Sequence, residues 1–280
     1  MTSEEYLHNI LRWREEMDAD LRRENGWLAA TGLYWLKEGV NTFGSSRDCD
    51  ILFPKQFSRL LGAFELNHST VTLHLDIGQT AELNGQTIRH EDPVVLKSEQ
   101  EDAPSFIKFG DIYALVVLHA DNVGLRLWDN SLSRRQDFPS RTWFPVSEEY
   151  NVQAHYIPYP IPMKVKLPNV FGEMVDDYAQ GYASFKLLGK FYRLYATEFE
   201  GARLYFQFQD QTNGKGTYPY GRYLYTETMD EEGWVNLDFN KAYNPPSAFS
   251  EYAICSFAPK LNRLRISIEA GETVTEQETR

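Results

Sequence analysis

The residues best suited to chemistry lie close together in the C-terminal half of the sequence. The stretch "LDFNKAYNPPSAF", residues 237–249, places Asp238, Asn240, Tyr243 and Asn244 just before two prolines. Asp238 and Asn240 are two residues apart, so on a strand both side chains point to one face. A carboxylate, an amide and a phenol on one rim could orient a polar ligand. The alternative is that the Asp and Asn side chains bond to nearby backbone and stabilise the turn.

A second stretch, "FQDQTNGKGTYPYGR" at residues 208–222, adds Asp210, Tyr218 and Arg222. Its glycines let backbone amides approach a ligand. Arg222 sits between aromatic residues, where an unpaired guanidinium is costly, so we expect an acidic partner and choose Asp238. That pair would be either a ligand clamp or a satisfied, semi-buried ion pair. The sequence thus predicts a ligand site framed by Asp210, Tyr218, Arg222, Asp238, Asn240, Tyr243 and Asn244.

Other reactive residue types give no comparable pattern. The six histidines have no metal-ligand spacing, and neither a "GxSxG" nucleophile elbow nor a dinucleotide fingerprint is present. Cys255 has apolar flanks and no nearby base, so we expect an inert, buried thiol. We therefore predict no metal and no cofactor, and we assign no catalytic residue.

The composition narrows the classes of partner. The 280 residues carry a net charge of -12, which repels nucleic acid and anionic membrane surfaces. The first residues include acids at once and do not form a secretory signal, and two cysteines are too few to staple the chain. We expect a soluble, cytoplasmic, acidic protein that binds a small molecule or a peptide.

The elements that position these residues are predicted to be mainly β. Residues 4–24 form the one expected helix, with a capping box at Thr2 and Glu5 and an apolar stripe of Leu7, Ile10, Leu11, Met17 and Leu21. Short aromatic and β-branched runs follow, with a hairpin turn at Asn84-Gly85. Four prolines within residues 155–171 indicate an extended edge or connector. The expected divisions are the helix (1–30), a β-sandwich (31–145) and a second antiparallel β unit (146–280).

Several phrases of the chain resemble a bacterial and archaeal family known as domain of unknown function 1684. They are "GWLAATGLYWLKEGVNTFGS", "GLRLWD", "FQDQTNGKGTYPYGRYL", "LDFNKAYNPPSAF" and "NRLRISIEAGE", spread over residues 26–272. The family has no assigned activity. The resemblance therefore implies a shared architecture and a shared polar cluster.

The N-terminal half is more weakly similar to forkhead-associated domains, which are β-sandwiches that read phosphothreonine. The order "VNTFGSSRDCDILFP", "FSRLLGAFEL" and "AELNGQTI" carries this similarity, and Ser58 and Arg59 match the family's Ser-Arg turn. Gly44-Ser45, Leu61 and Gln79 replace the family's other binding residues. Because phosphate capture needs several converging donors, we expect a degenerate sandwich that serves the structure.

Three functions remain open from the sequence. We favour a small-molecule or peptide-binding pocket in the C-terminal β half. The second hypothesis is a hydrolase that uses Asp238 as its general base. The third is a protein-interaction scaffold built on the degenerate sandwich.

Overall fold

The protein is mainly β, with an N-terminal helix and several antiparallel sheets, as the sequence predicts. A computed structural model describes residues 2–274, without the side chains of residues 198–200, and the chain divides into two compact units. Unit 1 contains Met1–Leu21 and Phe138–Arg280, and unit 2 contains Arg22–Asp137. The limits of 31–145 and 146–280 expected from the sequence stay a prediction.

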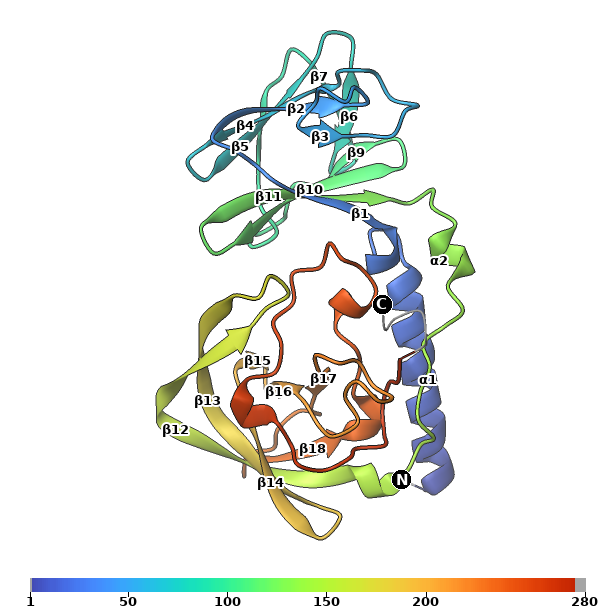
Figure 1. Cartoon of the computed structure of the whole chain (residues 1–280), viewed down its shortest axis with the longest axis vertical. Coiled ribbons are helices and arrows are strands. Elements are labelled where there is room, and N and C mark those ends of the chain that lie inside the picture. The colour runs from blue at the N-terminus through green and yellow to red at the C-terminus, as the bar shows by residue number, and fades with distance from the viewer. Residues whose placement is uncertain (1, 275–280) are drawn as a thin grey trace. The chain divides into compact units, whose positions relative to one another are not determined.

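Unit 2 is built from two sheets and two short helices, η1 (Trp27–Ala29) and α2 (Arg134–Asp137) (Figure 1). One sheet has the order β1 (Ala30–Trp35), β11 (Asn122–Asp129), β10 (Ile112–His119), β9 (Ile107–Phe109), β6 (Thr80–Leu83) and β7 (Gln86–Arg89). The other has the order β3 (Ile51–Leu52), β2 (Gly39–Gly44), β4 (Gly62–Asn67), β5 (Thr70–Leu75) and β8 (Val94–Leu96). The predicted turn at Asn84-Gly85 joins β6 to β7, and both residues have positive φ angles.

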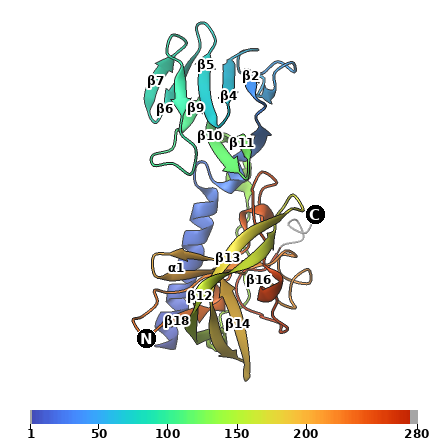
Figure 2. The same ribbon diagram turned by 90° about the vertical axis from the view of Figure 1, so that its left-hand side faces the viewer.

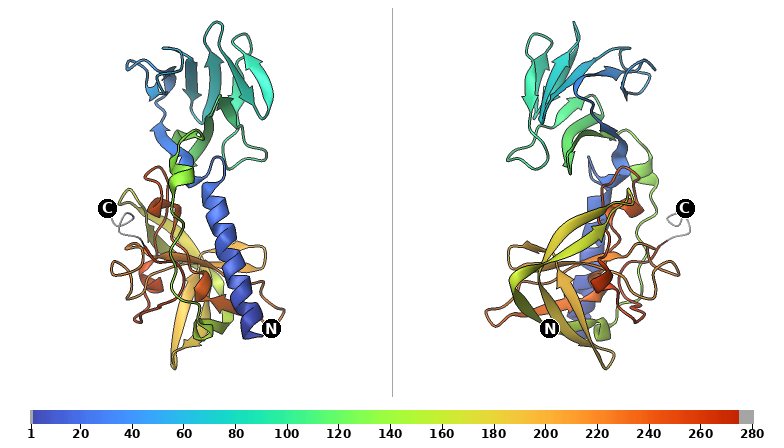
Figure 3. Two further views of the ribbon diagram at one scale, coloured as in Figure 1. Left: turned by 90° about the vertical axis from the view of Figure 1, so that its right-hand side faces the viewer. Right: turned by 60° about the vertical axis from the view of Figure 1, so that its left-hand side comes forward.

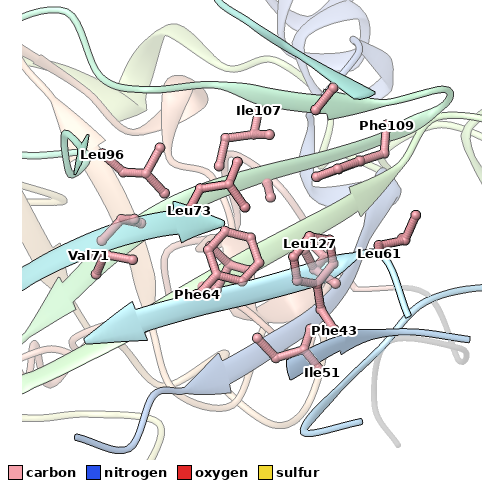
Figure 4. Close-up of a cluster of buried hydrophobic side chains, with 14 of the residues drawn as sticks. Phe43, Ile51, Leu61, Phe64, Val71, Leu73, Leu96, Ile107, Phe109 and Leu127 are labelled. Carbon is pink, nitrogen blue, oxygen red and sulfur yellow. The ribbon is translucent and has the colours of Figure 1, made fainter. Parts of the chain in front are cut away.

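The two sheets of unit 2 share one apolar core (Figure 4). Alternate residues of β4 are buried, because each sheet of a two-sheet sandwich turns one face to the core and the other face to solvent. The ring of Phe43 on β2 packs 4.7 Å from Phe64 on β4 and 5.3 Å from Phe109 on β9, measured between centroids. Unit 2 is therefore a β-sandwich, and its likeness to forkhead-associated domains stays a prediction.

Unit 1 begins with α1 (Ser3–Arg22), which runs alongside the strands of the unit (Figures 1 and 3). The predicted capping box forms: the Thr2 amide donates to Glu5 Oε2 at 2.8 Å, and the Glu5 amide donates to Thr2 Oγ1 at 3.2 Å. Ile10 and Leu21 of the predicted stripe are buried together with Tyr6. Leu7 and Leu11 of the same stripe are 43% and 46% exposed. Each follows a buried residue by one position, which turns it about 100° away from the strands.

The strands of unit 1 form two sheets around a second core. The larger has the order β14 (Lys190–Ala196), β13 (Met174–Leu187), β12 (Asn151–Pro168) and β18 (Trp234–Asp238), and Figure 2 shows the length of β12 and β13. The smaller has the order β15 (Glu198–Glu200), β16 (Arg203–Phe208) and β17 (Arg222–Tyr225). Phe185 on β13 and Phe206 on β16 belong to one buried cluster with Phe239, so the core is common to both sheets.

The proline-rich stretch forms most of β12. Its register with β13 is interrupted between Pro158 and Met163, and β18 pairs only with Asn151–His155. The prolines therefore lie beyond the segment that is paired on both sides, because they have no N–H to donate to a central ladder. The expectation of an extended edge is confirmed.

Residues 239–274 contain no long strand. They form isolated bridges and the short helices η3 (Phe239–Lys241), η4 (Pro246–Ala248) and η5 (Lys260–Asn262), while η2 (Glu148–Tyr150) precedes β12. Backbone groups that are not in a ladder need other partners when they are buried. Most of the predicted site residues supply those partners.

Candidate functional site

Arg222 and Asp210 form a fully buried ion pair. Arg222 Nη2 lies 2.8 Å from Asp210 Oδ2, and both side chains have no exposed surface. The same guanidinium donates to the carbonyl oxygens of Ile268 and Ala270. It therefore holds the segment that contains Ile268 and Ala270 against β17. A short neutral side chain could not reach the carboxylate and both carbonyls at once.

The second oxygen of Asp210 organises the loop before Arg222. Oδ1 accepts from the Thr212 amide at 2.8 Å, from Thr212 Oγ1 at 2.6 Å and from the Ile268 amide at 3.3 Å. Asn213 Nδ2 then donates to the Tyr218 carbonyl at 2.7 Å. Both carboxylate oxygens of Asp210 are thus occupied by groups of the chain itself.

Asp238 lies at the end of β18, where its carboxylate receives three kinds of donor. The Tyr6 hydroxyl donates to Oδ1 and Oδ2 at 3.0 Å each, and Oδ1 also accepts from the Asn240 amide and from Asn240 Nδ2 at 3.0 Å each. Asn240 in turn donates to the Ser147 carbonyl and accepts from the Ser147 amide. This arrangement begins η3 and ties α1 to the end of β18.

Burial dominates the electrostatics around Asp238. Desolvation raises the pKa of Asp238, although the bonds from Asn240 and Tyr6 oppose the shift. Desolvation and the neighbouring carboxylate also raise the pKa of Tyr6, which keeps its hydroxyl proton and donates it to Asp238. Burial lowers the pKa of Arg14, which stacks on Trp143 with 4.8 Å between Cζ and the ring centroid.

Asn244 belongs to a third buried network, around Glu272. Glu272 Oε2 accepts from the Asn244 amide and from Arg141 Nη1, both at 2.7 Å. Asn244 Nδ2 donates to the Thr273 carbonyl at 2.9 Å. Gly271 makes this approach possible: its φ is +81°, and a Cβ there would lie 2.6 Å from the Ala242 carbonyl oxygen.

The side chains of Tyr243 and Tyr218 lie outside these three networks. Tyr243 exchanges both backbone hydrogen bonds with Tyr223, and their rings meet edge to face at 5.9 Å between centroids. Tyr218 is the one predicted site residue that lines a described cleft. Its hydroxyl donates to Ser247 Oγ at 3.3 Å, and burial raises its pKa.

The cleft beside Tyr218 has a volume of about 390 Å³. Its lining comes from the β12–β13 turn, the loop before β17, η4 and the segment after η4: Asn169, Val170, Gly172, Tyr218, Tyr220, Ser247, Ser250, Glu251, Ala253 and Phe257. The Val170 amide donates to the Cys255 carbonyl, and the Phe257 amide donates to the Pro168 carbonyl. These bonds hold two walls of the cleft together.

The predicted pairing of Arg222 with Asp238 is wrong. Arg222 bonds to Asp210, which is closer in sequence, and Asp238 bonds to Tyr6 and Asn240. The strands that carry the two residues are not neighbours either, since β17 pairs with β16 and β18 pairs with β12. The connection between the two strands is short enough for a hairpin, but each strand joins a different sheet.

Sequence reasoning missed several residues of these networks. Tyr6 and Arg141 bond to partners more than 100 residues away, and no local signal indicates such pairs. Glu272 lies in the stretch "IEAGE", where the glycine directly before it was the one local sign of a close backbone approach beside an acid. In the cleft, Tyr220, Phe257 and Glu251 were also missed.

Two classes of site find no support in the part of the chain that the structure describes. Within residues 2–274, no group of three His, Cys, Asp or Glu side chains is placed to hold a metal ion. None of the helices in those residues is long and apolar enough to cross a bilayer. Cys49 and Cys255 are not joined by a disulfide.

The comparisons with known proteins match the chain to uncharacterised relatives. Residues 136–273 match the model of a family described as "Protein of unknown function (DUF1684)". None of the curated proteins matches the chain. A solution NMR structure of the uncharacterized protein from gene locus rrnAC0354 of Haloarcula marismortui is 29% identical, covers 51% of this chain and 80% of its own, and has a TM-score of 0.41.

Proposed function

We propose that unit 1 binds a small molecule or peptide in the cleft beside Tyr218. The residues that line this cleft lie within residues 136–273, the segment that matches the model of the DUF1684 family of unknown function. The seven residues expected from the sequence divide into two roles in this proposal. Tyr218 contacts the ligand. Asp210, Arg222, Asp238, Asn240 and Asn244 hold the surrounding loops in place, and Tyr243 anchors one of them to β17.

The observation that carries the proposal is an aromatic wall beside an unpaired carboxylate. The rings of Tyr220 and Phe257 are stacked, with 4.6 Å between centroids and 13° between planes, and Tyr218 meets Tyr220 edge to face at 5.6 Å. Glu251 is exposed at the cleft and makes no hydrogen bond or ion pair within residues 2–274. Rigid aromatic walls with few polar groups are typical of ligand sites.

This combination favours a ligand that carries a cationic group on an apolar body. Aromatic faces attract cations, and Glu251 supplies the opposite charge. The net charge of -12 draws cations toward the protein as a whole. We therefore propose an amine-bearing molecule or the free N-terminus of a peptide as the class of ligand.

No observation favours the two other functions over this one. A general base must reach the substrate, whereas Asp238 is 3% exposed, accepts bonds from Tyr6 and Asn240 and is not among the residues that line the cleft. The hydrolase and the interaction scaffold stay untested predictions.

Titration with tyramine, an aromatic amine, tests the proposal. We expect saturable binding by calorimetry, and much weaker binding of 4-ethylphenol, which has the same ring without the amine. Tyr220→Ala and Glu251→Gln should each weaken tyramine binding by about tenfold. Glu231→Gln removes the same charge from an exposed turn outside the cleft and serves as the matched control. Equal binding by all four proteins, or no binding by the wild type, would contradict the proposal.

A further inference from the structure

A second and larger cleft of unit 1 lies against β13 and β14. Its volume is about 770 Å³, within the range of small-molecule sites. Its lining comes from β13, from β14 and from the segment that follows η5: Ser184, Phe191, Tyr192, Arg193, Tyr195, Leu261, Arg263, Leu264 and Arg265. None of these residues was part of the site expected from the sequence.

Three arginines give this cleft a charge opposite to that of the chain. Arg193, Arg263 and Arg265 are all exposed at the cleft, and none of their guanidiniums makes an ion pair or a hydrogen bond within residues 2–274. The buried Arg222 and Arg141 of unit 1 differ, since they are matched by Asp210 and Glu272. Three unmatched guanidiniums in a chain of net charge -12 indicate a site for an anion.

The three side chains are carried on backbone that is held firmly. The buried Asn262 amide group accepts from the Tyr195 amide at 2.7 Å and donates to the Tyr195 and Gln207 carbonyls at 2.9 Å each. It thereby ties the segment after η5 to β14 and β16. Leu264 is buried between Arg263 and Arg265, and both arginines are exposed and line the cleft.

Arg193 is oriented by an aromatic ring. Its Cζ lies 4.7 Å from the centroid of Tyr182, and it sits directly opposite Ser184 in the β13–β14 ladder. A guanidinium that stacks by its face leaves its N–H edges for an acceptor, the geometry that matches phosphate and carboxylate oxygens. Tyr192 and the exposed ring of Phe191 add apolar walls to the cleft.

We propose that this cleft binds a small organic phosphate monoester whose body is a planar ring. A phosphate monoester is close to a dianion at neutral pH and offers three acceptor oxygens, which suits three guanidiniums that line one cleft better than a monoanionic carboxylate does. The aromatic and leucine side chains of the cleft cover the ring. The site is distinct from the cleft beside Tyr218, and the proposal does not depend on that function.

Calorimetric titration of the full chain with phenyl phosphate tests the proposal. At low salt and about pH 7.5, where the phosphate is mostly dianionic, we expect one saturable site whose affinity falls as salt is added. Inorganic phosphate lacks the ring and benzoate lacks the second charge, so both should bind at least about tenfold more weakly. Arg193→Gln and Arg263→Gln should each weaken phenyl phosphate binding by a similar factor.

Arg89→Gln provides the matched control, because it removes one exposed guanidinium from unit 2. It should leave the affinity unchanged. Circular dichroism spectra that superimpose on the wild type would show that the variants fold. The proposal is overturned if phenyl phosphate does not bind, if benzoate binds equally well, or if Arg89→Gln weakens binding as much as the cleft variants do.

Discussion

Side chains replace strand pairing where unit 1 has no ladder. The Asp210–Arg222 pair, the Asp238–Tyr6–Asn240 group and the Glu272–Arg141 pair each bond to backbone of the segment between residues 209 and 274 or to the elements beside it. A buried charge is costly unless its partner stays in place, so these pairs act as structural joints. Asp238, Asn240 and Asn244, which precede the two prolines, therefore hold the loops of unit 1 in place and do not line the cleft.

Removal of one charge of the Asp210–Arg222 pair should show this role. We expect Arg222→Met to lower the free energy of unfolding by about 3–5 kcal/mol, because the buried Asp210 carboxylate loses its partner. Urea denaturation followed by circular dichroism measures the change. Lys164→Ala, which breaks the exposed Lys164–Asp176 pair, is the control and should leave the curve near that of the wild type.

The double variant Arg222→Met/Asp210→Asn separates charge from packing. If the unpaired charge causes the loss, neutralising Asp210 should restore part of the stability that the single variant lacks. A single variant as stable as the wild type, or a double variant no better than the single one, would argue against a structural joint.

The elements themselves were largely predictable from local patterns. The capping box at Thr2, the turn at Asn84-Gly85 and the proline-interrupted edge each depend on residues within a few positions of one another, and each forms as expected. The site was only partly predictable. Tyr6 meets Asp238 across 232 positions of sequence, and the choice of Asp210 over Asp238 as the partner of Arg222 depends on which sheet each strand joins.

The bond from Tyr6 to Asp238 docks α1 onto the end of β18. We expect Tyr6→Phe to destabilise the protein by about 1–3 kcal/mol at neutral pH, because the buried carboxylate loses a donor. Urea unfolding of both proteins from pH 7 to pH 11 or so measures this loss and its pH dependence. Tyr178→Phe removes a half-exposed hydroxyl on β13 and serves as the control.

The sign of the pH dependence follows from the raised pKa of Tyr6. Burial and Asp238 hold that pKa above its ordinary value of 10.0, so the folded chain keeps a proton that the unfolded chain releases. The contribution of Tyr6 is therefore complete below pH 10 and declines as the pH rises beyond it. The stability difference between wild type and Tyr6→Phe should shrink above pH 10; a constant difference would mean that Tyr6 is not held in this way.

The whole molecule combines two units with separate cores and different expected roles. The core of unit 2 contains residues from Phe43 to Leu127. The core that the two sheets of unit 1 share contains residues from Tyr150 to Ala270. Both proposed clefts belong to unit 1. Unit 2 carries the resemblance to domains that bind phosphothreonine. Whether unit 2 binds phosphopeptides depends on whether Ser58 and Arg59, which match those domains, can hold a phosphate without the other donors.

We expect the full chain not to distinguish phosphothreonine peptides from their unphosphorylated forms. Gly44-Ser45 and Leu61 replace donors that phosphate capture requires, and the Ser58 hydroxyl donates to Gln79 Oε1 at 3.2 Å. The net charge of -12 further disfavours an anionic peptide. Fluorescence polarisation with paired peptide libraries measures the difference. Phosphate-dependent binding in the micromolar range that Arg59→Gln abolishes would show instead that Ser58 and Arg59 suffice, and that unit 2 reads phosphothreonine without the replaced donors.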